Sequence, residues 1–309
     1  MPASKLSAMR FLNMAVLGLA ASLLGLAPSP AFVQDAAKAE KLDELDKPHR
    51  VLSFNIRYGS ADDGLDHWKL RRPRVVATMT SLNADVVGLQ ETESFQVREL
   101  LAALPRYAAV GVQRDDGLLS GEGTTLLYDR TRYTLAAAGT YWLSDTPDVA
   151  GSNTFGAACN RTCTWARLVD LESATTFYVY NTHFDHKSQV AREKSAELLV
   201  RKISARGDEI PFVVTGDLNA DEANPALLGL MRGGEGWSLV DSYRVHHPDE
   251  EAGTYTAFRI DSSGGSKKID YVLCGPGIRA MAADIDRRKV DGRYPSDHFP
   301  VWADLRFER

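Results

Sequence analysis

Four apolar, strand-like stretches of this chain lead into residues that can bind a metal ion or move a proton. These residues are Asn55 in VLSFNIR, Glu91 in VVGLQE, His183 in YNTHFDH, and Asp217 with Asn219 in VVTGDLNA. Four strands that each deliver a carboxylate, amide or imidazole at the same end indicate an active site on one rim of a sheet. The pattern predicts a metal-dependent hydrolase.

Hydrolysis of a phosphate ester has three requirements. The attacking water must lose a proton, it must approach a negatively charged phosphate, and the leaving oxygen must be stabilised. Mg²⁺ or Mn²⁺ supplies much of this chemistry and prefers carboxylate and amide oxygens. Glu91 and Asn55 are ligands of that kind. Asp217 and Asn219 lie two residues apart, so a strand-like geometry would point both side chains the same way.

A histidine with a carboxylate partner forms the second part of the pattern. Asp297 and His298 are adjacent in YPSDHFPV, and Asp270 opens the strand-like segment IDYVL. A carboxylate can orient an imidazole and stabilise its charge, so we expect Asp270 to be the partner of His298. Each motif alone has a plainer explanation: GDLN can be a turn, and THFDH can be a solvated cluster or a surface zinc site.

Strands that alternate with a few helices must position these residues. Helical spacing predicts a helix over 70–82, with Pro73 in its first turn, and a longer helix over 188–206 that stops at Gly207. TWARLVDL and TFYVYNTHF are expected to pair as neighbouring strands. Because all the strands share one site, the sequence indicates a single α/β domain.

The N-terminus has the features of an export signal. A short basic region precedes an apolar run over 11–26, and small residues follow near Ala31. An uncleaved membrane anchor is the alternative, because the run is close to the shortest that spans a bilayer. We therefore expect a periplasmic or extracellular protein, or one anchored to a membrane. The expected boundaries are a signal peptide at 1–31, a linker at 32–49 and one domain at 50–309.

The order SFNIR, GLQE, NTHFDH, GDLNA, IDYV and SDHFPV resembles the endonuclease/exonuclease/phosphatase superfamily over residues 50–307. The resemblance implies a four-layer, deoxyribonuclease-like α/β sandwich with two sheets. The segments NIRYGSADDGLDHWKLRRP and NTHFDHKSQVAR are similar to a bacterial branch of secreted or membrane-associated members. Members of the superfamily cleave very different phosphate esters, so the resemblance leaves the substrate open.

The resemblance also implies a role for each motif residue. Asn55 and Glu91 would hold the metal, Mg²⁺ or Mn²⁺, with Asp297 as a further ligand or as a partner of one. Asp217 would orient or deprotonate the attacking water, and Asn219 would hold the phosphate.

Further roles follow for residues around the leaving group and the phosphate. His298 would contact the scissile phosphate with Asp270 as its acid partner, and His183 would lie near the leaving group. Arg161 in CNRTCTWAR would bind the phosphate, with Arg167 as the alternative. Glu122 matches a catalytic acid of some nucleases in the superfamily.

Charge bears on the substrate. The net charge of −5 does not favour a nucleic-acid partner, although Lys267 with Lys268 and the run 287–289 could attract a polyanion. We expect a monomeric phosphodiesterase acting on a small or lipid-derived substrate. A secreted endo- or exonuclease is the alternative, and an inactive binding protein of the same fold is the second alternative.

Other residues have structural interpretations that the fold can test. Cys159 and Cys163 could form a small-loop disulfide or remain thiols, and Cys274 is expected in the core. Packing is expected for three tryptophans, with a place in the site as the alternative: Trp68, Trp142 and Trp165. A solvated helix face is expected for three arginines: Arg71, Arg72 and Arg74.

Overall fold

The computed structural model describes residues 47–259 and 265–308. The predicted signal peptide and nearly all of the predicted linker lie outside these described residues. Within the described ranges, no helix has both the length and the apolar character needed to cross a membrane.

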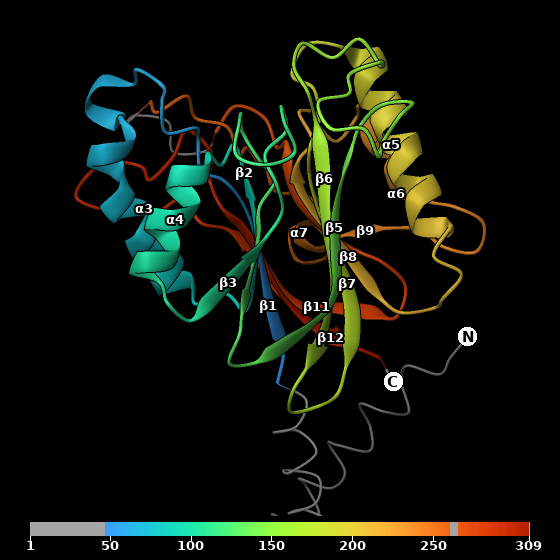
Figure 1. Cartoon of the computed structure of the whole chain (residues 1–309). Coiled ribbons are helices and arrows are strands. Elements are labelled where there is room, and N and C mark those ends of the chain that lie inside the picture. Colours follow the sequence, from blue (N-terminus) through green and yellow to red (C-terminus); the bar gives the residue numbers. More distant parts are fainter. Residues whose placement is uncertain (1–46, 260–264, 309) are drawn as a thin grey trace, which may run out of the picture. The chain divides into compact units, whose positions relative to one another are not determined.

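Two six-stranded sheets form the centre of the domain (Figure 1). The first has the order β11-β12-β1-β2-β4-β3 and the second β5-β6-β7-β8-β10-β9. The predicted pairing of the segments around 162–183 is confirmed, because β6 and β7 run antiparallel. The strands of the first sheet are β1 His49–Asn55, β2 Val86–Gln90, β3 Tyr107–Val110, β4 Leu126–Asp129, β11 Ile278–Ile285 and β12 Val301–Phe307. Those of the second are β5 Tyr133–Trp142, β6 Thr162–Asp170, β7 Thr176–His183, β8 Phe212–Asp217, β9 Val240–Asp241 and β10 Asp270–Cys274.

Helices cover the outer faces of both sheets, so the predicted four-layer α/β sandwich is confirmed (Figure 1). On the first sheet lie α3 Trp68–Leu82 and α4 Ser94–Ala103, and on the second α5 Gln189–Ser204 and α6 Pro225–Arg232. Two short helices, η1 Gly64–Asp66 and α7 Ser242–His246, complete the described elements.

Helix α3 begins before the predicted start, so the placement of Pro73 in its first turn was wrong. The His67 side chain accepts a hydrogen bond from the Lys69 N–H and caps the helix. Trp68 is buried in the core under α3, which favours a helical start there. Pro73 consequently lies inside the helix.

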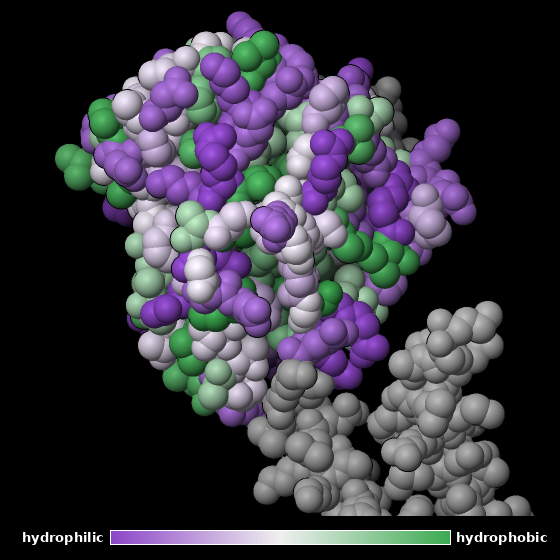
Figure 2. Space-filling view, turned by 90° about the vertical axis from the view of Figure 1, so that its right-hand side faces the viewer, coloured by the Kyte–Doolittle hydropathy of each residue, from purple (hydrophilic) through white to green (hydrophobic). Residues whose placement is uncertain are grey.

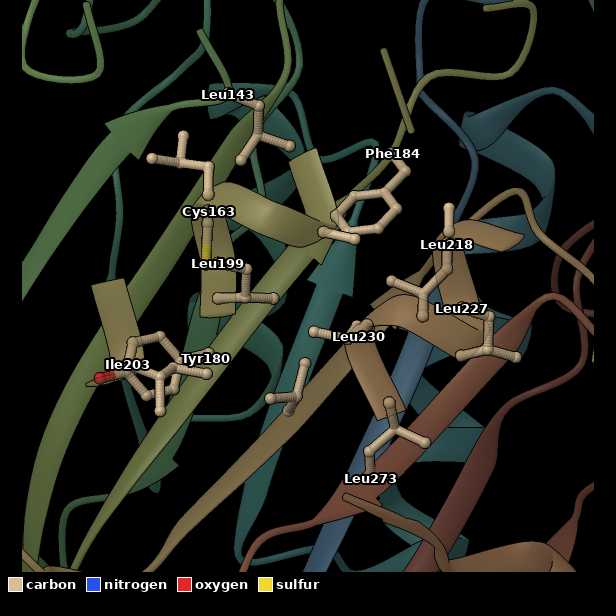
Figure 3. Close-up of a cluster of buried hydrophobic side chains, with 14 of the residues drawn as sticks. Leu143, Cys163, Tyr180, Phe184, Leu199, Ile203, Leu218, Leu227, Leu230 and Leu273 are labelled. Atoms are coloured by element: carbon tan, nitrogen blue, oxygen red, sulfur yellow. The ribbon is translucent and has the colours of Figure 1, made fainter. Parts of the chain in front are cut away.

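Apolar side chains fill three spaces between these layers. Val51, Val86, Val179 and Val213 meet between the two sheets. A second cluster lies between the first sheet and α3, and a third lies between the second sheet and α5 with α6 (Figure 3). On the side of the domain seen in Figure 2, hydrophobic residues are scattered among hydrophilic ones.

The cysteines of the described chain are free thiols. Cys163 lies in β6 with its side chain in the third apolar cluster (Figure 3). Cys159 lies on the loop that precedes β6. Cys159 and Cys163 are therefore thiols in the structure, and the alternative of a disulfide between them is not seen. Cys274 is buried as predicted.

The expected solvated arginine face was wrong for two of its three members. Arg71 and Arg74 are buried, and only Arg72 is substantially exposed. Arg74 forms an ion pair with Asp66 (3.2 Å), and the contacts of Arg71 are described below.

Packing, the expected role of the tryptophans, is confirmed. Trp68 and Trp142 are buried, and Trp165 packs against the third apolar cluster.

Candidate active site

Strand register brings the motif residues to one edge of the sandwich. In the first sheet, parallel strands β1 and β2 end side by side, with Asn55 opposite Gln90 and Glu91 next in the chain. In the second sheet, His183 of β7 is opposite Asp217 of β8. The carboxyl ends of all four strands therefore deliver polar groups at the same edge.

The remaining acid–base residues come from the antiparallel neighbours of these strands. Asp270 opens β10 opposite Asp217. His298 lies in the loop before β12, and its Nδ1 is 2.9 Å from Asp270 Oδ2. The predicted Asp270–His298 pair is thus present in the structure.

Apolar neighbours fix the direction of two site residues. Phe184 follows His183, and Leu218 lies between Asp217 and Asn219; both apolar side chains point into the core beneath α5 and α6 (Figure 3). The Phe184 N–H donates to the Asp217 carbonyl oxygen at 3.0 Å, which ties the two strand ends together. Alternation along the chain therefore turns the polar side chains away from that core.

Asp217 is at the centre of the polar cluster. Its Oδ2 accepts a hydrogen bond from Asn55 Nδ2 (2.9 Å) and lies 3.3 Å from His183 Nε2 and 3.7 Å from His298 Nε2. Its Oδ1 accepts from the Asn219 N–H at 2.9 Å. Burial, followed by the charge of Asp270, raises the pKa of Asp217 from 3.8 to about 7. A carboxylate with a pKa in this range can take up a proton near neutral pH.

The two histidines beside Asp217 have opposite electrostatic environments. Burial alone would lower the pKa of His298, but the charges of Asp270 and Asp217 raise it well above the ordinary value. Burial and the nearby Arg161 guanidinium instead lower the pKa of His183 well below that value. This environment therefore favours the protonated form of His298 and the neutral form of His183. The Asn219 amide nitrogen lies 3.0 Å from His183 Nε2 and also donates to the Phe184 carbonyl oxygen.

Oxygen ligands suited to a divalent cation gather on the side of the first sheet. Asn55 Nδ2 donates to Glu91 Oε1 at 3.0 Å as well as to Asp217, so one amide joins two carboxylates from different sheets. Burial and the charge of Glu91 raise the pKa of Asp297, which shows the crowding of negative charge here. Ligand atoms of Glu91, His183 and Asp217 all lie within 4.8 Å of one another. The carboxylates of Glu91 and Asp297 and the Asn55 amide oxygen are donors of the kind that Mg²⁺ and Mn²⁺ prefer.

These residues surround a cavity of about 410 Å³. Seven of the nine candidate site residues line it: Glu91, Arg161, His183, Asp217, Asn219, Asp297 and His298. The other two, Asn55 and Asp270, are fully buried and hydrogen-bond to lining residues. The structure thus brings all nine together.

Arginines and a histidine also line the cavity. Arg161 Nη2 lies 3.0 Å from His186 Nδ1, while its Nε and Nη1 are buried without a hydrogen-bond partner among the described residues. Arg167, the alternative, lies within β6 and is not among the residues that line the cavity. Glu122 also lines it and is held by Arg114 through two hydrogen bonds.

Seven further lining residues were not among the predicted site residues: Arg57, Tyr58, Arg114, Cys159, His186, Tyr255 and Ile269. Arg57 follows Asn55 by two residues, a spacing that could have indicated it. Tyr255 packs against the His298 ring with centroids 5.1 Å apart, but its segment carries no motif. Arg114 reaches the site only through the fold of a glycine-rich loop.

Known proteins share both the sequence pattern and the fold. A model of the Endonuclease/Exonuclease/phosphatase family matches residues 52–298. A structure of an endonuclease/exonuclease/phosphatase from Bacteroides vulgatus is 34% identical with a TM-score of 0.75, and the match covers 84% of this chain and 99% of that one. A mannosyl-6-phosphatase from Bacteroides thetaiotaomicron is 29% identical with a TM-score of 0.76, over 84% of this chain and 100% of that one.

A curated relative from an animal matches more distantly. Nocturnin of Drosophila melanogaster is 24% identical over an alignment of 305 residues that covers 83% of this chain and 46% of Nocturnin. This chain therefore spans about half the length of that relative.

The family match includes every candidate site position from Asn55 to His298. It also agrees with the two-sheet fold and with the convergence of the motifs at one edge. The chain belongs to the endonuclease/exonuclease/phosphatase family.

Proposed function

We propose that this chain is a divalent-metal-dependent phosphoesterase that hydrolyses a phosphate ester of a small substrate. The observation that carries the proposal is the setting of Asp217. Its carboxylate is buried at the floor of the cavity, in contact with Asn55, Asn219 and the two histidines. Such a group is suited to accept the proton of an attacking water.

Each neighbour then has a defined part in the proposed reaction. A Mg²⁺ or Mn²⁺ ion would polarise a phosphoryl oxygen, and Asn55, Glu91 and Asp297 would hold it. Asp217 takes the proton from water, while the cationic His298 stabilises negative charge on the phosphate. The charge of His298 is maintained by Asp270 at 2.9 Å.

Other residues that line the cavity supply the remaining contacts. The Nη1–H₂ group of Arg161 has no hydrogen-bond partner among the described residues and can donate to phosphate oxygens, while its Nε lies 3.8 Å from Asp185 Oδ2. Asn219 is fixed by His183 and the Phe184 carbonyl oxygen, so its amide is already oriented before the substrate binds. His183 lies beside both Asn219 (3.0 Å) and Asp217 (3.3 Å), so it helps to hold these two side chains in place.

A small substrate is supported by the cavity volume of about 410 Å³ and by the similar mannosyl-6-phosphatase. The sequence led us to expect a diester, whereas that relative's name favours a monoester, so both classes belong in the test. The net charge of −5 continues to disfavour the nuclease alternative. Export to the periplasm or beyond remains our proposal from the N-terminal residues alone.

Replacement of Asp217 by Asn tests the proposal. The amide has nearly the volume of the carboxylate but cannot act as a base, so we expect turnover to fall about 10²- to 10⁴-fold. p-Nitrophenyl phosphate and its bis-ester, each with Mn²⁺, report on monoesters and diesters. The exposed Asp249→Asn is the matched control. Parental turnover by a folded D217N variant would remove Asp217 from the proposed role.

A further inference from the structure

Arg71 of α3 is a fully buried cation that binds main-chain carbonyl groups. Its guanidinium donates to the carbonyl oxygens of three successive residues: Ile56 through Nη1, and Arg57 (2.6 Å) and Tyr58 (3.5 Å) through Nη2. The segment 56–58 directly follows Asn55, at the end of β1. Arg71 therefore holds the stretch of backbone that directly follows Asn55, the first proposed metal ligand.

The same segment contacts both Asn55 and Glu91 from its other side. The Tyr58 N–H donates to Glu91 Oε2 at 3.1 Å, and the Arg57 N–H donates to Asn55 Oδ1 at 2.9 Å. Arg57 has φ of 58°, a left-handed conformation that a non-glycine residue adopts only when its surroundings hold it there. Arg71 donates a hydrogen bond to the carbonyl oxygen of this same residue, so it helps to hold the left-handed conformation.

Aromatic rings hold the Arg71 guanidinium in place. Its Cζ lies 5.0 Å from the Trp68 ring centroid and 5.8 Å from that of Phe258. Burial lowers the pKa of Arg71 to about 10, so the side chain remains charged at neutral pH. A buried charge is expensive to maintain, and an apolar side chain would fill the same space under α3 without that penalty.

Arg74, three residues on, provides a direct comparison. It is also buried in α3, but it forms an ion pair with Asp66 and donates to the Leu65 carbonyl oxygen, and among the described residues it has no hydrogen bond to the segment 56–58. A buried arginine that only anchors α3 is thus already present. Arg71 differs because its planar fork of donors matches converging carbonyl oxygens next to the site.

We propose that Arg71 is a positioning residue for the metal side of the active site. By fixing the segment 56–58, it orients Asn55 and Glu91 before the ion arrives. The inference rests on the proposed metal-dependent function, since it assigns Arg71 a part in metal binding and none in the chemical step.

Mn²⁺ binding to the metal-free full chain tests this inference without using activity. Titration calorimetry compares the parent with R71M, R71K and R74M, each below the onset of its thermal unfolding. Partners that orient metal ligands typically contribute about 10- to 100-fold to affinity, so we expect R71M to weaken binding by that factor. R71K should lie between R71M and the parent, because an ammonium cannot reproduce the planar fork. R74M should lower the melting temperature and leave Mn²⁺ affinity unchanged.

The outcomes separate the inference from the proposed function. Parental Mn²⁺ affinity in folded R71M and R71K would overturn the inference alone. R71K decides by itself if R71M does not fold. Equal weakening in R71M and R74M would also overturn it, since the effect would then reflect a general loosening of α3. A parent chain that binds no Mn²⁺ would contradict the metal-dependent function and the inference together.

Discussion

Several carboxylates lie close together around Asp217. This arrangement lowers the stability of the metal-free fold but suits the binding of a cation. Glu91, Asp217, Asp270 and Asp297 come from four separate segments and meet at one buried edge. Their mutual repulsion and burial make ionisation of Asp217 and Asp297 unfavourable in the folded chain. A divalent cation would relieve that repulsion.

The raised pKa of Asp217 predicts how stability depends on pH in the metal-free protein. The pKa of Asp217 is about 7 in the folded chain and 3.8 ordinarily. The protonated carboxyl group therefore contributes to the free energy of unfolding in full below pH 3.8, and this contribution is lost as pH rises to about 7. Asp217→Asn removes this titration. We expect the free energy of unfolding of D217N, relative to the parent, to increase by up to about 1.4 kcal/mol per pH unit across that window.

Urea unfolding in EDTA at several pH values measures this difference. Asp249→Asn, at an exposed position, is the control for the change of an aspartate to its amide. A flat difference for D217N would mean that Asp217 is not desolvated as described.

The two sheets approach each other closely beneath the site, at Gly88 of β2. A Cβ atom there would lie 2.6 Å from Asn181 Oδ1 and would also collide with Thr215 Oγ1 on the facing strands. Asn181 accepts a hydrogen bond from Gln90 (2.7 Å) and donates to the Leu89 carbonyl oxygen (2.8 Å), so it links the sheets. The spacing of the two strand sets therefore depends on a residue without a side chain.

Gly88→Ala is expected to destabilise the chain by about 1–3 kcal/mol, as overpacking of a tight interior does, and to reduce turnover by shifting β2 and Glu91. Gly229→Ala in α6 is the control, because its Cβ meets nothing within 4 Å and helix propensity favours alanine by about 0.5–1 kcal/mol. Urea unfolding and turnover of both variants measure the effects. Parental stability in G88A would contradict the described contact between the sheets.

The elements that carry the site could be predicted because their sequence signals are strong. β1, β2, β7 and β8 are buried apolar runs that end in polar motif residues, so their sequences indicated both their type and their shared edge. The chain also resembled its family over nearly the whole domain.

Weaker signals explain what was missed. β5 and β11 contain several alanines and partly exposed positions, so neither has a clear apolar run. The spacing of Arg71 and Arg74 was typical of an exposed face, and their burial follows from carbonyl and carboxylate partners that only the fold provides.

The charge distribution of the whole molecule bears on its substrate. Lys268, one of the residues expected to attract a polyanion, is buried and paired with Asp241 at 2.6 Å. The expectation was wrong for Lys268, because this lysine lies just before β10, where its side chain is buried in the core and does not reach the surface. Lys267 is exposed but lies 3.4 Å from Asp221, and Arg288 is paired with Asp286.

We therefore expect weak cleavage of duplex DNA relative to a small phosphate ester. Non-specific binding to duplexes relies on lysines and arginines that neutralise phosphates, and it weakens steeply as salt rises. Plasmid nicking and hydrolysis of a chromogenic ester, compared at equal enzyme and Mn²⁺ in about 0.15 M salt, measure the preference. Nicking that persists at this salt and outpaces the ester would favour the nuclease alternative.

Metal dependence of ester hydrolysis tests the central claim most directly. The chain is treated with EDTA, dialysed and assayed on p-nitrophenyl phosphate and its bis-ester, before and after addition of Mn²⁺. We predict that hydrolysis is lost on chelation and returns with Mn²⁺, and that Glu91→Gln shifts the return to higher Mn²⁺ concentration because it removes a charged ligand. Full hydrolysis by the EDTA-treated chain, with no response to Mn²⁺, would contradict the account.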